Sequence, residues 1–376
     1  MNFNNYFRSR QNEIVRFLKE IVARESPTRE KKSVDACSTF VSEEFRKLGS
    51  RIQRFPQKDI GDLFLIEYPR PTSRAASEQI LILTHIDTVW PVGKIVKMPF
   101  YISGEKIFGP GVLDMKAGLA MSLFALKALR ELNLKPAKKI ALFINSAEET
   151  GHEAAHDMIR KLARQSEAIL CLEPALPGGG LKTERKGRLV MRLEVRGKAA
   201  HAGSPENGVN AIEELMGQLG RLKKIRTGGV TFSVDLIGGG EKANVVAENA
   251  WAVVDLRFWS SRQEERIRKF FKGMIPDRVG AKLKSSVESS TPPMEKTTAS
   301  AKLLAWTRGL AADLGLTLTE GKAGGGSDAS IASKLGLPTL DGLGPDGDGM
   351  HAENEHVLLP SLVERTALLT EILLQL

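Results

Sequence analysis

The chain has 376 residues, 42% of them hydrophobic and 26% charged, with a formal net charge of +9. This composition is typical of a folded globular protein and excludes disordered and collagen-like chains. Basic residues are interleaved with acids, as in residues 262–269, so we expect no nucleic-acid partner. No uncharged apolar run reaches the roughly 18 residues of a membrane span, and the first residues show no signal peptide, so we expect no membrane partner and a cytoplasmic location. With only Cys37 and Cys171 in the chain, we expect no disulfide.

The first part of the chain alternates between helical and strand patterns. Helical spacing of apolar residues is seen at 14–22, and longer helical stretches are expected at 115–132 and 150–164. Short apolar strands are expected at 64–66, 80–83, 140–144 and 168–172. This alternation predicts an α/β domain with a mostly parallel mixed sheet and helices on both of its faces.

The pattern changes after residue 180. Alternating polar and apolar residues predict strands at 189–195, 230–234 and 250–258, and helices are expected at 208–225 and 262–274. They indicate a smaller α+β domain with an antiparallel sheet. Helical patterns return at 298–314 and from about residue 360. We therefore predict a larger domain formed by residues 1–182 and 293–376, interrupted by the α+β domain at 183–292.

Acids and histidines follow the predicted strands of the larger domain. They are His85, Asp87, Glu148, Glu149 and Glu173. Because the carboxyl ends of parallel strands share one edge of a sheet, where α/β proteins bind ligands, we expect these side chains to lie close together. His85 and Asp87 are two residues apart in an extended segment, so they share a face and could be a ligand and its orienting partner. A simple hydrogen bond at the strand end is the alternative.

Two further residues lie in glycine-rich loops. Asp114 stands between a glycine-rich turn and a predicted helix, where an N-cap aspartate is the alternative. His351 lies in the loop at 347–355. Two imidazoles and several carboxylates suit zinc or a similar divalent ion, and they suffice for two ions that share one carboxylate.

Six segments carry these residues in chain order: THIDTV, GPGVLDMKAG, SAEETG, CLEP, GKAAHAG and GMHAENE. Together they resemble the M20 family of co-catalytic zinc peptidases and deacylases, most closely its glutamate carboxypeptidase branch. The resemblance implies two zinc ions, with cobalt or manganese as alternatives, and Asp114 as the ligand that both ions share. It implies that His85 and Glu173 complete one site and that Glu149 and His351 complete the other.

The resemblance also implies roles for residues that hold no metal. Asp87 would orient His85, and Glu148 would be the general base, next to a ligand and able to carry a proton from water to the leaving amine. His201 resembles the family histidine that supports the tetrahedral oxyanion, reaching across a homodimer formed by the inserted domain. A structural histidine in a turn is the alternative for His201.

The expected substrate is a small peptide or an N-acyl amino acid. By resemblance, Asn244 and Arg257 would bind its carboxylate, and Gly326 would offer backbone there; the planar guanidinium of arginine suits a carboxylate. We therefore predict a di-zinc hydrolase that cleaves an amide next to a free carboxylate and releases a C-terminal amino acid such as glutamate. An N-acyl-amino-acid deacylase is the alternative.

Two other interpretations remain open at this point. Residues 152–156 read HEAAH, which matches the HExxH motif of single-zinc peptidases, although three fixed positions make a weak signal. The same residues would otherwise be two solvated histidines on a helix. The second alternative is a non-catalytic relative that binds amino-acid-like ligands without metal.

Overall fold

The computed structural model describes residues 2–69 and 78–376. The chain divides into two compact units, which are described separately below. Unit 1 comprises Met1–Thr183, Lys296–Ala323 and Ser327–Leu376, and unit 2 comprises Glu184–Glu295 and Gly324–Gly326.

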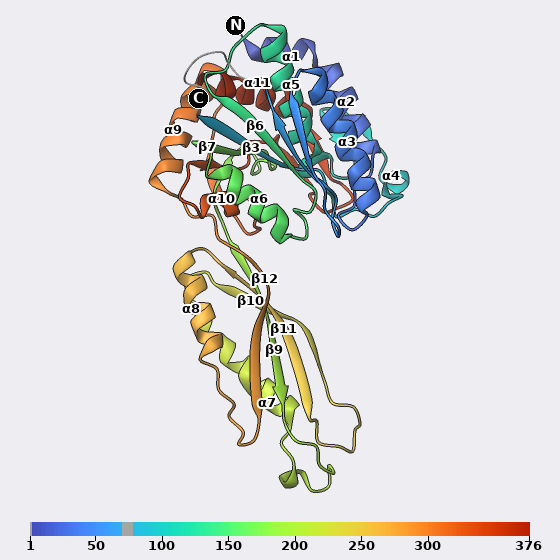
Figure 1. The fold of residues 1–376 in the computed structure, drawn as a ribbon, viewed down its shortest axis with the longest axis vertical. Coiled ribbons are helices and arrows are strands. Elements are labelled where there is room, and N and C mark those ends of the chain that lie inside the picture. The colour runs from blue at the N-terminus through green and yellow to red at the C-terminus, as the bar shows by residue number, and fades with distance from the viewer. Residues whose placement is uncertain (1, 70–77) are drawn as a thin grey trace. The chain divides into compact units, whose positions relative to one another are not determined.

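The centre of unit 1 is a mixed sheet whose described strands run in the order β1-β2-β6-β3-β7-β14 (Figure 1). Its strands are β1 (Arg51–Phe55), β2 (Leu63–Glu67), β6 (Lys139–Asn145), β3 (Gln79–His85), β7 (Ala168–Cys171) and β14 (Thr339–Leu340). Strands β6, β3, β7 and β14 pair in parallel, whereas the pairs β1–β2 and β2–β6 are antiparallel. The mostly parallel mixed sheet predicted from the sequence is confirmed.

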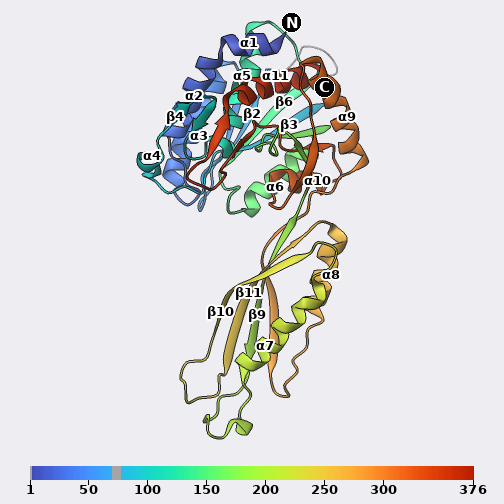
Figure 2. The ribbon, with the colours of Figure 1, turned by 180° about the vertical axis from the view of Figure 1, so that it is seen from behind.

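Helices cover both faces of this sheet. One face is covered by α2 (Gln11–Ala23), α3 (Lys31–Lys47), α5 (Ala117–Glu131) and α11 (Leu359–Gln375), and α6 (Glu153–Ala163) and α10 (Asp328–Ser333) lie on the other (Figures 1 and 2). Successive strand residues point to opposite faces, so Ile80 and Ile82 join the core formed with the first group of helices. None of the helices in the described ranges is long and apolar enough to cross a membrane.

The predicted helix at 115–132 begins later than expected. Asp114 and Met115 have non-helical backbone angles, and α5 starts at Ala117. Its second residue, Gly118, packs closely on the chain after β7, because a Cβ atom there would lie 2.6 Å from the carbonyl oxygen of Leu172. The glycine therefore lets α5 approach the segment that leads to Glu173.

A smaller antiparallel sheet in unit 1 has the described strand order β15-β16-β5-β4. Its strands are β4 (Tyr101–Ser103), β5 (Lys106–Phe108), β15 (Gly347–Asp348) and β16 (His356–Leu358). Because β15 pairs with β16, the loop between them, which carries His351, is anchored at both ends.

Unit 2 is built on an antiparallel sheet with the described strand order β10-β11-β9-β12. Its elements are β9 (Gly187–Arg196), α7 (Ala211–Arg221), β10 (Thr231–Gly239), β11 (Asn249–Phe258), α8 (Ser261–Lys272) and β12 (Lys282–Thr291). A core of its own includes Leu193, Val254 and Phe271. The predicted smaller α+β architecture is confirmed, but β12 was missed because its sequence, KLKSSVESST, has only two large apolar residues.

Candidate metal centre

Asp114 is positioned by the glycine-rich turn that precedes α5. Gly111 has a φ of 69° in the left-handed region, and a Cβ atom there would lie 2.5 Å from Cγ2 of Thr88, so only glycine fits. Asp114 is not the N-cap residue of α5, a place that Lys116 occupies, and its carboxylate is buried. The N-cap alternative is therefore wrong, and both carboxylate oxygens are directed elsewhere.

The two oxygens of Asp114 face two different histidines. Its Oδ1 lies 3.1 Å from Nε2 of His85, and its Oδ2 lies 3.1 Å from Nε2 of His351. The same nitrogen of His85 lies 3.4 Å from Oε1 of Glu173, and that of His351 lies 3.3 Å from Oε2 of Glu149. The structure thus brings together all five residues expected to hold metal, in two groups that share Asp114.

His85 is held so that its Nε2 faces this cluster. Its Nδ1 lies 3.0 Å from the backbone oxygen of Asp87 and 3.5 Å from the Asp87 carboxylate. That carboxylate is buried and also accepts hydrogen bonds from the Thr28 hydroxyl (2.7 Å) and from the backbone N–H groups of Glu148 (3.1 Å) and Glu149 (3.2 Å). With Nδ1 engaged in this way, Nε2 of His85 is available as a ligand.

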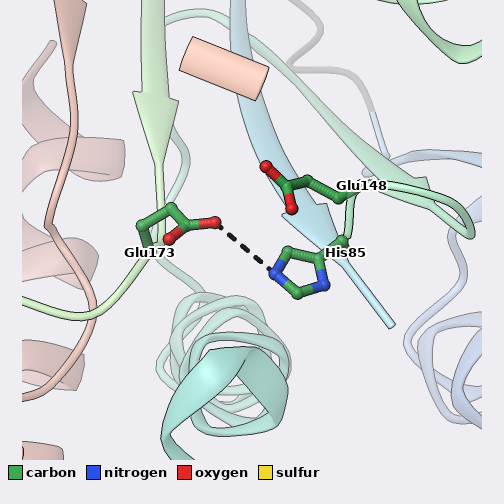
Figure 3. Close-up of side chains that lie close together, drawn as sticks. All are labelled: His85, Glu148 and Glu173. Atoms are coloured by element: carbon green, nitrogen blue, oxygen red, sulfur yellow. Dashed lines mark ion pairs between the residues drawn. The ribbon is translucent and has the colours of Figure 1, made fainter. Parts of the chain in front are cut away.

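Glu148 lies beside the cluster, between the ends of β6 and β3. Figure 3 shows its carboxylate close to His85, with Glu173 reaching the same imidazole from the neighbouring strand. Ligand atoms of His85, Glu148 and Glu173 all lie within 4.8 Å of one another, and the same holds for His85, Asp114 and Glu149. Distances alone therefore allow Glu148 to be either a ligand or a base.

The electrostatics of the cluster favour cations. Burial, reinforced by Glu173, raises the pKa of Glu148 well above its usual range, and burial also raises the pKa of Glu149. Hydrogen bonds to Asp114 and Glu149 raise the pKa of His351 to about 10. Buried carboxylates at this density repel one another unless protons or cations compensate. Imidazole nitrogens and carboxylate oxygens are ligands that zinc accepts, so the residues present fit a pair of divalent ions.

In unit 2, two of the predicted residues lie together. His201 forms a bridge with Val245, and the backbone oxygen of Asn244 accepts the N–H of Ala202 at 3.0 Å. His201 is exposed, and its Nδ1 accepts the N–H of Gly203 at 3.0 Å, so the ring is held within its own turn. This segment lies near the Asn249 end of β11.

The other two predicted residues of unit 2 lie at the opposite end of its sheet. Arg257, near the end of β11, donates from Nε to the Asp255 carboxylate at 2.6 Å. The carbonyl oxygen of Gly326 accepts from the Arg185 guanidinium at 3.0 Å, and a Cβ atom on Gly326 would lie 3.2 Å from Thr291 at the end of β12. The four residues therefore lie in two pairs at opposite ends of the unit 2 sheet, and the structure does not bring all four together.

The HExxH segment does not form a zincin helix. His152 is the N-cap residue of α6, with extended backbone angles, and its Nδ1 accepts the N–H of Ala154 at 3.3 Å. His156 is buried inside the helix, and burial lowers its pKa. Neither histidine belongs to a group of potential ligands among the described residues. This geometry gives the single-zinc alternative no support.

Two residues of the site region escaped the sequence analysis. Asp328, at the start of α10, is buried, accepts from the side-chain amide of Asn145 at 2.8 Å, and has its pKa raised to about 7 by burial. Lys116 is buried, and its ammonium donates to the carbonyl oxygens of Ile21 and Arg24, both at 2.9 Å, at the end of α2. Asp328 could have been noticed as the acid that follows the glycine-rich run GGGS. The sequence around Lys116 does not indicate that this lysine is buried.

Comparisons with known proteins identify the family of the chain. Residues 81–375 match the model of peptidase family M20/M25/M40. The chain is 26% identical over 371 residues to carboxypeptidase G2 of Pseudomonas sp. (strain RS-16), covering 96% of this chain and 89% of that protein. It is also 26% identical over 376 residues to succinyl-diaminopimelate desuccinylase of Thioalkalivibrio sulfidiphilus (strain HL-EbGR7), covering 94% of this chain and 96% of that one.

A solved structure shares the whole architecture. The crystal structure of a tripeptidase from Staphylococcus aureus subsp. aureus Mu50 superposes with a TM-score of 0.80 at 21% identity, over 96% of this chain and 97% of that chain. The family model spans most of the chain, and a His, Asp and Glu cluster able to hold metal lies at the carboxyl edge of the sheet. The chain therefore belongs to peptidase family M20/M25/M40 and is a hydrolase.

Proposed function

We propose that the protein is a di-zinc hydrolase that cleaves an amide bond next to a free carboxylate and releases a C-terminal amino acid such as glutamate. The observation that carries the proposal is the position of Asp114, whose two oxygens each lie 3.1 Å from a different histidine. Similarity to carboxypeptidase G2 over nearly the full length of both chains supports the choice of a C-terminal amino acid.

The metal ligands proposed are those predicted from the sequence. His85, Glu173 and one oxygen of Asp114 would hold one ion, and His351, Glu149 and the other oxygen of Asp114 would hold the second. When bound, the two cations acidify a water molecule and polarise the scissile carbonyl. Asp87 keeps the Nδ1 edge of His85 occupied, so that Nε2 stays directed at its ion.

Glu148 is proposed as the general base. Burial and the nearby Glu173 raise its pKa well above the usual range of a glutamate, and a carboxylate with a raised pKa is a stronger proton acceptor. Its backbone N–H is bound to Asp87, so the segment that carries it is fixed to the end of β3. In this role the Glu148 carboxylate takes a proton from water and passes it to the leaving amine.

Residues of unit 2 are proposed to complete substrate recognition. Arg257 and the backbone at Gly326 would bind the substrate carboxylate, and His201 would support the developing oxyanion. Asn244, which lies beside His201, would reach the same carboxylate from the copy of the chain that provides His201. His201 and Arg257 lie toward opposite ends of the sheet, and the ten-residue strand β11 is about 30 Å long. A small peptide is shorter than this distance, so one substrate could not contact both residues of the same chain. This supports an active site in which His201 and Arg257 come from different copies of the chain.

We propose that the copies associate through residues 183–292 as a homodimer. The described edge strand β10 exposes Val234, Leu236 and Ile237, of which Leu236 and Ile237 are 57% and 59% exposed. An apolar edge strand of this kind is stabilised when another chain pairs with it. Light scattering of the purified protein tests the proposal, and a monomer at micromolar concentration would contradict it.

An N-acyl-amino-acid deacylase is the second candidate. The chain aligns with succinyl-diaminopimelate desuccinylase over 94% of its length, so similarity alone does not separate the two activities. Both reactions hydrolyse an amide next to a carboxylate, and they differ in which side of that amide is recognised.

A substrate panel on the zinc-loaded protein separates these activities. One series keeps a benzoyl group and varies the released residue among glutamate, glutamine and lysine; the other keeps glutamate and varies the acyl group among benzoyl, acetyl and succinyl. The proposal expects benzoyl-glutamate to exceed benzoyl-glutamine at least tenfold in kcat/KM. Glutamine lacks the side-chain carboxylate of glutamate, so a group of the enzyme that pairs with this carboxylate would be left unpaired. Cleavage of acetyl and succinyl donors alone would identify a deacylase.

Metal content tests the chemistry separately. Elemental analysis of gently purified protein should find two divalent ions per chain. Fewer than one ion per chain, together with no hydrolysis of the panel after zinc is added, would instead favour a non-catalytic relative that binds amino-acid-like ligands.

We also propose a cytoplasmic location. Cys37 lies buried in the core of unit 1 as a thiol whose sulfur is 3.8 Å from the backbone oxygen of Ile21. Buried thiols of this kind are typical of proteins in reducing compartments. Fractionation of the cells that make the protein tests this, and recovery outside the cytoplasm would contradict it.

A further inference from the structure

Glu355 is fully buried and lies four residues after His351. Its carboxylate accepts four hydrogen bonds from N–H groups. Oε2 accepts from Nε1 of Trp90 at 2.9 Å and from the backbone of Gly111 at 2.9 Å, and Oε1 accepts from the backbones of Leu113 at 2.9 Å and Asp114 at 3.1 Å. Both oxygens are thus fully engaged.

These four donors come from two segments distant in sequence. Trp90 follows β3, the strand that ends at His85, and the three backbone donors belong to the turn that carries Asp114. Glu355 itself belongs to the loop that carries His351. One side chain therefore connects three segments, each of which provides a proposed metal ligand.

We propose that Glu355 is a positioning residue that sets the spacing of His85, Asp114 and His351 for the two metal ions. This inference rests on the di-metal function proposed above. Glu355 is not itself a ligand, since both of its oxygens point at N–H donors and it belongs to no ligand group among the described residues. It acts through the backbone of Asp114, whose N–H it holds directly.

The Glu355 side chain adds a contact to the loop of His351, whose ends pair as β15 and β16. His351 has a φ of 61°, in the left-handed region that residues with a side chain rarely adopt. The loop closes on itself through hydrogen bonds from Ala352 to Gly349 (2.8 Å) and from Glu355 to Ala352 (3.0 Å). The Glu355 side chain then fixes this closed loop to the turn of Asp114.

The substitution Glu355→Gln tests the inference. Glutamine has the same shape but only one oxygen, so its NH₂ group must face two of the four N–H donors. We expect the zinc affinity of the full-length protein, measured by competition with a chromophoric chelator, to fall at least tenfold. Activity should be partly restored by excess zinc, because the ligands themselves are intact.

Two controls accompany this variant. Glu353→Gln alters an acid two residues away, whose side chain is 79% exposed and pairs with Lys94, and it should bind zinc as the unmodified protein does. Leu369→Ala removes apolar volume from the core at α11 and changes none of the hydrogen bonds of Glu355, so its zinc affinity should be unchanged despite a lower Tm. A fall in affinity confined to Glu355→Gln therefore reports positioning and not lost stability.

Trp90→Phe decides the matter if Glu355→Gln does not fold, as judged by circular dichroism. It removes one of the four hydrogen bonds and keeps a ring in place, so we expect a loss of zinc affinity of a few-fold. If Glu355→Gln folds and binds zinc as tightly as the unmodified protein, the inference is overturned. If Glu355→Gln does not fold, equally tight zinc binding by Trp90→Phe overturns it. Failure of the unmodified protein to bind two zinc ions would instead overturn the proposed function.

Discussion

The carboxylate of Asp87 accepts a hydrogen bond from the backbone N–H of Glu148 at 3.1 Å. Asp87 also lies against Nδ1 of His85 and accepts from the hydroxyl of Thr28 at 2.7 Å. A single buried acid therefore orients a proposed ligand and holds the segment that carries the proposed base. Its removal should affect metal binding and proton transfer together.

The substitution Asp87→Asn should reduce both zinc affinity and kcat by 10- to 100-fold. Asparagine keeps the size of the side chain. Its NH₂ group, however, replaces one of the two oxygens, each of which accepts a backbone N–H in the unmodified protein. Thr28→Val is the matched control, because it removes only the hydroxyl and should cause a much smaller loss. Competition with a chelator and steady-state kinetics measure the two effects, and equal losses in both variants would contradict the role of Asp87.

Glu148→Gln distinguishes a base from a ligand. If Glu148 is the base, the variant keeps two zinc ions per chain while kcat falls by 10²- to 10⁴-fold. If Glu148 is a ligand, as its distances to His85 and Glu173 also permit, the variant loses metal. Elemental analysis beside kinetics gives the answer, and loss of an ion would show that the assignment as base is wrong.

The parallel sheet and the site at its edge could be predicted because local sequence specifies them. His85 ends one short apolar strand and Glu173 comes two residues after another, and parallel strands place those ends together. Strand β12 could not be predicted, since its polar sequence acquires strand structure from its pairing with β9. The links made by Glu355 to Trp90 and to Asp114 depend on contacts between residues far apart in sequence, which no local pattern encodes.

His351→Ala and His152→Ala provide opposite expectations for the two zinc interpretations. Because His351 faces Asp114 and Glu149, its loss should remove one zinc ion per chain and abolish activity. His152 caps α6, so its loss should lower stability by about 0.5–2 kcal/mol and leave zinc content unchanged. Loss of metal in His152→Ala, with metal retained in His351→Ala, would support the single-zinc peptidase interpretation instead.

The stability of the chelator-treated protein should fall as the pH rises above 6.5. Hydrogen bonds to Asp114 and Glu149 raise the pKa of His351 from 6.5 to about 10, so this histidine's contribution is complete below pH 6.5 and is lost as the pH rises toward 10. Burial raises the pKa of Glu148 and Glu149, which acts in the same direction because the folded state then binds more protons than the unfolded state.

Zinc should remove this pH dependence, since cations take the place of the protons. We therefore expect the difference in Tm between zinc-loaded and chelator-treated protein to widen between pH 6.5 and about pH 9. Scanning calorimetry in buffers of equal ionic strength measures the difference. A constant difference over this range would show that His351 is not protonated in the chelated protein.

Gly118 offers a test of how tightly α5 must pack against the segment that carries Glu173. A Cβ atom at Gly118 would lie 2.6 Å from the carbonyl oxygen of Leu172, so Gly118→Ala should destabilise the protein by about 1–3 kcal/mol despite the better helix propensity of alanine. Gly309, in α9 (Thr298–Asp313), is the control: outside its own helix, no atom of the described residues would lie within 4 Å of a Cβ added there, so Gly309→Ala should stabilise by about 0.5–1 kcal/mol. Denaturant midpoints that move in opposite directions would support the close approach.

The same substitution should also weaken zinc binding, because the backbone that must shift at Leu172 leads directly to Glu173. A destabilised Gly118→Ala variant with unchanged zinc affinity would show that the packing of α5 does not set the geometry of the site.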